Sequence, residues 1–239
     1  MKTRRISLVT IALSAGVLAG LLPAVLPAQA QEAKSPYPSA APLDQYLMAD
    51  HDAEVALART AAPKSVSDDA EVLVLGRDGY TTAVKGGNGF VCLVERAFAA
   101  STDFTEFWNP KNRSPICLNA AAARTHLPFV QMKAKLVFAG KSKAEIAQAV
   151  TSALANKELP TPEPGAMCYM MSKQQYLNDG ARNWHPHLMW FVPGDAGKSW
   201  GAAADSPVMA ANDPEEGMTI MMVWVDHWSD GTPGPQAAH

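Results

Sequence analysis

Short apolar runs separated by turn residues form the clearest pattern in the chain, and they lie at residues 71–75, 80–84 and 90–94. The turns between them are Asp78-Gly79 and the glycine-containing segment 86–89. Runs of this length with turns of this chemistry predict a three-stranded antiparallel meander. The glycines are interpreted as turn residues rather than a phosphate-binding loop, because neither a helix start nor Gly-Lys-Ser/Thr follows them.

Helical spacing of apolar residues occurs in three other segments. Residues 43–60 and 119–139 have apolar positions three or four apart, so each is predicted to be helical, and Pro128 is expected to kink or restart the second helix. Ser142 and Glu145 form a capping-box pattern, which predicts a third helix ending near residue 157. Residues 97–118 mix aromatic and loop-forming residues and are expected to form a long ordered loop.

The last third of the chain returns to short apolar runs, at residues 166–172, 187–192 and 218–225, which are predicted strands. Strands, then helices, then strands predict an α+β fold: an antiparallel sheet of about five to six strands with helices packed on one face. We expect this single domain to span residues 43–230. A flexible proline-rich segment, 31–42, precedes it and an irregular tail, 231–239, follows it.

Residues 1–30 have the three parts of an export signal. Basic residues open the segment, an uncharged and mostly apolar run covers residues 6–27, and Ala28-Gln29-Ala30 offers a small-x-small cleavage site. Glycines and prolines interrupt the apolar run and no basic cluster follows it, which favours cleavage after Ala30 over a retained anchor. We therefore expect a periplasmic or secreted protein without a membrane anchor once the signal is removed. The Arg4-Arg5 pair leaves export of the folded chain open beside the ordinary secretory route.

Charge and composition exclude several classes of protein. The chain has 20 basic and 23 acidic residues, and removal of residues 1–30 would take away three basic residues and no acidic one. A nucleic-acid-binding protein needs a basic surface to replace phosphate counterions, so nucleic acid is not an expected partner. The 18 prolines and 16 glycines argue against a coiled coil or simple helical bundle.

The three cysteines fit an oxidising compartment, in which one disulfide and one remaining thiol are expected. Cys92 and Cys117 flank the loop-rich segment, so we predict that they are bonded and that Cys168, within an apolar run, is a buried thiol. Sequence alone does not fix the connectivity, so the other pairings stay open.

Two histidines two residues apart, His185 and His187, are the most suggestive candidates for chemistry. In a strand beginning at Pro186 they would share one face, and His227 ends the apolar run of a neighbouring strand. Three imidazoles at one rim would suit Zn or Cu. The alternative is that they are polar surface groups or hydrogen-bonded packing groups. A cupin-like interpretation fails because no Glu follows the His-x-His pair at the required distance.

Methionine and tryptophan are concentrated in the same third of the chain. Eight of the 11 methionines follow residue 160, which suggests a copper(I) site but is explained more simply by sheet-core packing or an adaptable apolar binding surface. Trp184 and Trp228 are candidate ligand-binding residues, because binding clefts are often lined by aromatic side chains with a few polar groups. Nucleophilic catalysis has little support: Gly-x-Ser-x-Gly is absent, and His51, His126 and His239 lie in no recognisable motif.

Residues 88–95, 160–167 with 169–173, and 184–189 resemble segments of a group of exported bacterial proteins with no known activity. The resemblance implies an exported bacterial origin and transfers no reaction, cofactor or catalytic residue. Two hypotheses therefore remain. The favoured one is a non-catalytic binding module for an unidentified small molecule or protein. The alternative is a metal-dependent enzyme or metal-handling protein that uses His185, His187 and His227.

Overall fold

The computed structural model describes residues 35–181, 183–203 and 205–235, so the predicted signal segment 1–30 lies outside the described residues. Its elements, in chain order, are η1 (Leu43–Tyr46), α1 (His51–Arg59), α2 (Lys64–Ser67), β1 (Glu71–Gly76), β2 (Gly79–Val84), β3 (Val91–Glu95), η2 (Ala97–Ala99), β4 (Ser114–Leu118), α3 (Ala120–Thr125), α4 (Leu127–Phe138), α5 (Lys143–Ala155), β5 (Met167–Met170), β6 (His187–Pro193), η3 (Lys198–Trp200), β7 (Val208–Asp213) and β8 (Met218–Trp224). In these ranges no helix is long and apolar enough to cross a membrane.

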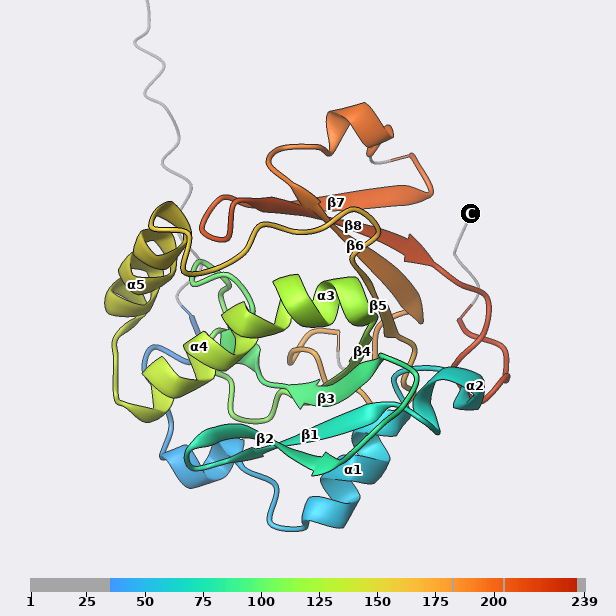
Figure 1. Ribbon diagram of the computed structural model, residues 1–239, viewed down its shortest axis with the longest axis horizontal. Helices are drawn as coiled ribbons and strands as arrows, with labels where there is room; N and C mark the ends of the chain where they lie inside the picture. The colour runs from blue at the N-terminus through green and yellow to red at the C-terminus, as the bar shows by residue number, and fades with distance from the viewer. Residues whose placement is uncertain (1–34, 182, 204, 236–239) are drawn as a thin grey trace, which may run out of the picture. The chain divides into compact units, whose positions relative to one another are not determined.

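The strands form one sheet of eight, in the order β2-β1-β3-β4-β5-β6-β8-β7, so the expected mixture of helix and sheet is confirmed but the sheet is larger than five to six strands (Figure 1). The two strands missed by the sequence pattern are β4 and β7. β4 lies at the end of the segment that was expected to be loop, where Pro115 interrupts the β-branched pattern although all five strand residues are buried. β7 is an edge strand of mostly small residues that pairs with β8.

The first three strands do not form the predicted antiparallel meander. β1 and β2 are an antiparallel hairpin, but β3 lies on the other side of β1 and runs parallel to it. The connection from β2 crosses the start of β1, where a Cβ added to Gly86 would come within 2.1 Å of the Glu71 nitrogen. The Gly87 amide donates to the Asp69 carbonyl at 2.9 Å in the same crossing. The glycines therefore permit a close backbone approach rather than a tight hairpin turn.

The helices lie on both faces of the sheet, which corrects the expectation of a single covered face. On one face, Ala58 of α1 packs in a cluster with Val72, Cys92 and Val94. On the other face, residues of α3 and α4 pack in a cluster with Leu93 and its neighbours in β1, β4 and β5. Figure 1 shows α1 on one side of these strands and α3 and α4 on the other. The cause is that β1, β3 and β4 carry consecutive buried apolar residues between their ends, so both of their faces need cover.

The local helix signals are confirmed with small adjustments. Asn119 caps α3, Pro128 lies in the first turn of the restarted helix α4, and Ser142 and Glu145 form the predicted capping box of α5. The segment 43–60 is divided into η1 and α1, because Asp50 caps a fresh helix start with its side chain. The predicted strands of the last third are β5, β6 and β8.

The predicted disulfide is confirmed. Cys92 of β3 lies directly opposite Cys117 of β4 in the antiparallel register, and the two are bonded. Cys168 is free and buried, as expected. Burial raises the pKa of the Cys168 thiol well above its usual value, so this thiol is protonated and poorly reactive at neutral pH.

Candidate functional site

The histidines singled out from the sequence occupy three different environments. His187 is 2% exposed, and its Nδ1 lies 2.7 Å from the carbonyl oxygen of His185. The ring of His185, just before β6 begins, instead stacks on Trp224 with centroids 4.0 Å apart. His227 is exposed and pairs through its backbone with Pro233. Among the described residues no three His, Cys, Asp or Glu side chains are grouped so that they could hold a metal ion, and the metal hypothesis has no geometric support there.

The two candidate tryptophans are placed differently from each other. Trp228 is 6% exposed, and its backbone amide donates to the Thr232 carbonyl, so it packs inside the C-terminal segment. Trp184 is half-buried and packs edge-on against His187 with ring centroids 4.7 Å apart. Trp184 and Trp224 make a second edge-on contact. Trp184 therefore packs against two other aromatic rings, whereas Trp228 is buried in a different segment.

The burial of His187 gives a testable dependence of stability on pH. Burial disfavours the charged ring and lowers the pKa of His187 from 6.5 to about 4. Between these two values the unfolded chain binds a proton that the folded chain excludes, so the free energy of unfolding should fall as the pH falls through this window. We expect His187 to contribute about 3 kcal/mol to the loss between pH 7 and pH 4.

Urea denaturation at several pH values between 7 and 4 measures this contribution. The variant His187→Gln should show a shallower decline than the native chain, whereas His51→Gln, which replaces an exposed histidine of α1, should keep the native decline. An unchanged decline in His187→Gln would show that this ring does not titrate as its burial implies.

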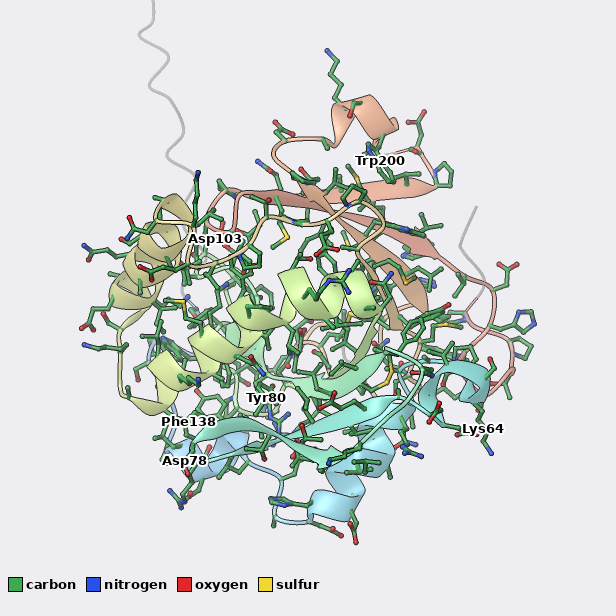
Figure 2. The ribbon with its side chains drawn as sticks, viewed as in Figure 1. Lys64, Asp78, Tyr80, Asp103, Phe138 and Trp200 are labelled. Atoms are coloured by element: carbon green, nitrogen blue, oxygen red, sulfur yellow. A yellow bond between two sulfur atoms is a disulfide. The ribbon has the colours of Figure 1, made fainter. Side chains whose placement is uncertain are left out.

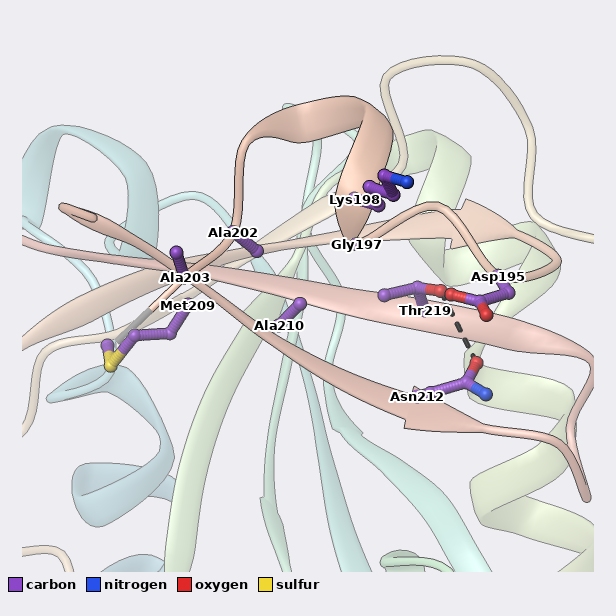
Figure 3. A pocket seen from close by; sticks show the side chains of 9 residues that line it. All are labelled: Asp195, Gly197, Lys198, Ala202, Ala203, Met209, Ala210, Asn212 and Thr219. Carbon is purple, nitrogen blue, oxygen red and sulfur yellow. Dashed lines mark hydrogen bonds between the residues drawn. The ribbon is translucent and has the colours of Figure 1, made fainter. Parts of the chain in front are cut away.

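Two hollows lie at the side of the sheet that is formed by the last strands of the chain, β6, β7 and β8. The first, of about 460 Å³, lies between the η3 segment and β7–β8, and Figure 3 shows the side chains around it. The Thr219 hydroxyl in its wall is already satisfied, since it donates to the Gly194 carbonyl at 2.6 Å and accepts from the Ala196 amide at 2.9 Å. The second hollow lies between Trp190, Trp200 and the loop at 162–166 and is mostly apolar. Trp200 projects from η3 and is 46% exposed (Figure 2).

A third cavity combines apolar walls with buried charged groups, and we call it the Glu95–His126 pocket. Its volume is about 210 Å³. Glu95 at the end of β3 and His126 between α3 and α4 are two of its titratable groups, and Arg96 is the third. Its other lining residues are Arg96, Ala97, Ala99, Ala100, Phe104, Asn112, Ser114, Met170, Leu177, Asn178, Met189, Phe191 and Ile220.

His126 is held between two carboxylates. Its ring stacks on Phe191 with centroids 4.0 Å apart, and its side chain is 8% exposed. Nε2 lies 3.7 Å from Oε1 of Glu95, and Nδ1 lies 3.8 Å from Oε2 of Glu216. Both separations exceed a hydrogen bond, so Nδ1 is buried without a hydrogen-bond partner. The imidazole is therefore positioned by packing, with carboxylates on two sides.

A buried lysine, Lys133, pairs with Glu216, the carboxylate next to His126 Nδ1. The Lys133 ammonium donates to Glu216 Oε1 at 2.5 Å and to the Ala100 carbonyl at 3.0 Å, and it lies 3.4 Å from Glu215 Oε1. Burial by itself would lower the pKa of Lys133, but the carboxylates of Glu216 and Glu215 outweigh it and raise that pKa. Lys133 is therefore charged, and its charge is shared by two carboxylates.

Glu95, like His126, carries an unsatisfied polar atom at the pocket. Its Oε1 is buried without a hydrogen-bond partner, and its side chain is 12% exposed. Buried polar atoms are normally paired, because an unpaired one loses its hydration without compensation. The carboxylate is thus an available acceptor beside an apolar cavity, which is the arrangement of many small-molecule sites.

Sequence reasoning missed this site. Glu95, His126 and Glu216 come from the end of β3, the α3–α4 junction and the β7–β8 turn, and no local motif joins them. One signal was present in the sequence: Lys133 lies on the apolar face of α4, among the buried residues Val130, Ala134 and Val137. A lysine in an apolar stripe indicates a buried partner of opposite charge.

Comparison of the chain with protein-family models, with curated proteins and with solved structures gave no match in any of the three. The choice of the Glu95–His126 pocket over the two C-terminal hollows therefore rests on its geometry. Of these three hollows among the described residues, it is the one that joins an unpartnered buried carboxylate to an apolar wall.

Proposed function

We propose that the protein is a binding module for a small molecule, which occupies the Glu95–His126 pocket. The observation that carries the proposal is the Glu95 carboxylate, whose Oε1 is buried without a partner beside walls that are mostly apolar. A ligand that donates a hydrogen bond to this carboxylate would compensate for the lost hydration of Oε1. Burial of the ligand's apolar part against the pocket walls would add a favourable hydrophobic contribution. Export to an oxidising compartment, supported by the Cys92–Cys117 disulfide, belongs to the same proposal.

The size of the pocket sets the size of the ligand. A cavity of about 150 Å³ is enough to hold benzene in another protein. A pocket of about 210 Å³ therefore accommodates one substituted ring or another small molecule of similar size. A peptide or nucleotide is too large to be enclosed. Simple phenyl-ring compounds are therefore suitable probes, because they share an apolar ring and differ in the polar group attached to it.

Binding of benzylamine, benzyl alcohol and benzoate, measured by calorimetry and by shifts of backbone amide resonances, tests the proposal. We expect at least one of the three to bind with a dissociation constant of about 1 mM or below and to shift amides around Glu95 and His126. Filling the pocket with Ile220→Phe should weaken that binding at least fivefold. The control Val223→Phe changes a half-buried residue on the opposite face of the same strand and should leave binding unchanged.

The result that would contradict the proposal is equally specific. If none of the probes binds, or if Ile220→Phe leaves the affinity unchanged while the variant remains folded, the pocket is not the ligand site.

A further inference from the structure

We infer that the ligand of the Glu95–His126 pocket is a small organic cation, a protonated amine on an apolar body. This inference rests on the proposed function of the pocket and adds the charge and class of the ligand. It follows from three features of the described residues: the balance of charges, the state of the hydrogen-bond donors, and the character of the walls.

The charge balance around the pocket is negative. Glu95 and Arg96 line the cavity, and the Arg96 guanidinium is balanced by its ion pair with Glu54. Glu216, whose Oε2 lies 3.8 Å from His126 Nδ1, and Glu215 share the single ammonium of Lys133. That ammonium is used by Glu216 and Glu215, and its third contact is the Ala100 carbonyl. Glu95 therefore has no cation opposite it among the described residues except a protonated His126. A bound ammonium group would supply the missing charge and form a charge-assisted hydrogen bond.

The polar donors in the pocket wall are largely engaged elsewhere. Arg96 is 1% exposed, and its guanidinium donates to Glu54, Tyr46 and Val94 rather than into the cavity. The Asn112 side-chain amide donates to the Leu177 carbonyl at 2.6 Å, and the Ser114 hydroxyl donates to Asn112 Oδ1 at 3.1 Å. A carboxylate or phosphate ligand would find these donors occupied and would face the Glu95 carboxylate at low dielectric.

A second polar side chain of the wall, that of His126, also lacks hydrogen-bond partners, although carboxylates lie on two sides of its ring. The His126 side chain is more than nine-tenths buried, lines the pocket and carries an unpartnered Nδ1. The remaining wall is apolar and includes Phe104, Met189 and Ile220. Such a wall suits the hydrocarbon part of an amine. It does not suit a hydrated metal cation, which would keep its water shell.

The three phenyl-ring probes distinguish ligand classes, since they differ in charge at pH 7.5. We expect benzylamine to bind about tenfold or more tightly than benzyl alcohol, and benzoate to show no binding. Glu95→Gln keeps the shape of the side chain and removes its charge. It should weaken benzylamine binding about tenfold and change benzyl alcohol binding less than twofold. Glu158→Gln, which replaces an exposed carboxylate far along the sequence, should change neither.

Each outcome decides between the two proposals. Equal binding of benzylamine and benzyl alcohol, or tighter binding of benzoate, overturns the amine inference and leaves the binding pocket standing. Failure of all three probes overturns the pocket itself. The comparison of probes on the native chain needs no variant, so the inference remains testable even if Glu95→Gln does not fold.

Discussion

Replacement of Arg96 by Met is expected to lower the free energy of unfolding by about 3–5 kcal/mol, because it leaves a buried carboxylate without its cation. Arg96 and Glu54 form an ion pair at 2.9 Å, and both side chains are 0% exposed. Arg96 also donates to the carbonyls of Tyr46 and Val94, and Glu54 accepts from the Leu75 amide at 3.3 Å. The pair thus links α1 and the N-terminal segment to the sheet.

Urea denaturation of four chains measures the effect: the native protein, Arg96→Met, Glu54→Leu and the double variant. Each single variant should lose about 3–5 kcal/mol, whereas the double variant should recover part of that loss, since no charge is then left buried and unpaired. Removing the exposed pair Arg77–Asp44, whose side chains are about two-thirds exposed, should change the stability little. Single variants as stable as the native chain would show that solvent reaches this pair.

Removal of the Cys92–Cys117 disulfide is expected to cost about 3–4 kcal/mol, because the bond closes a loop of 25 residues in the unfolded chain. The double variant Cys92→Ala/Cys117→Ala should therefore unfold at a clearly lower urea concentration than the native chain. The two cysteines are also fully buried in the sheet, so a smaller packing loss is expected in addition.

A reducing agent separates the two contributions to that loss. Dithiothreitol should destabilise the native chain by most of the difference and should leave the double variant unchanged. Thiol labelling of the unfolded chain provides a further check, since it should detect only Cys168 before reduction and all three cysteines afterwards. If reduction does not change the stability of the native chain, the bond does not constrain the unfolded state as proposed.

The sequence determined the features that depend on a few neighbouring residues. Asn119, Ser142 with Glu145, and Pro128 act on the helix in which they lie, so caps and breaks were predictable from position alone. The β1–β2 hairpin follows from Asp78-Gly79, where Gly79 has a φ of 103°. The disulfide was predictable because few pairings are possible with three cysteines.

The arrangement of the strands was decided by the tertiary structure. Glycines at 86–89 indicate a change of chain direction, but they do not say whether β3 pairs with β2 or crosses to β1. The crossing is favoured because it places the apolar β3 inside the sheet, between β1 and β4, where both of its faces are covered. The same burial explains why helices pack on both faces, since a strand without a polar face must be covered twice.

The candidate site is also a product of the tertiary structure. Glu95, His126 and Glu216 lie in three separate segments, and each by itself has the pattern of an ordinary polar residue at the end of an element. Of the residues around the site, only Lys133 departs from the pattern of its segment, since it is a charged residue on the apolar face of α4. Burying a charge there is costly unless a partner from another segment pairs with it. That partner comes from the β7–β8 turn, 83 residues further along the chain. The sequence thus determined which residues could carry charge into the core, and only the packing of distant segments decided which of them meet beside a cavity.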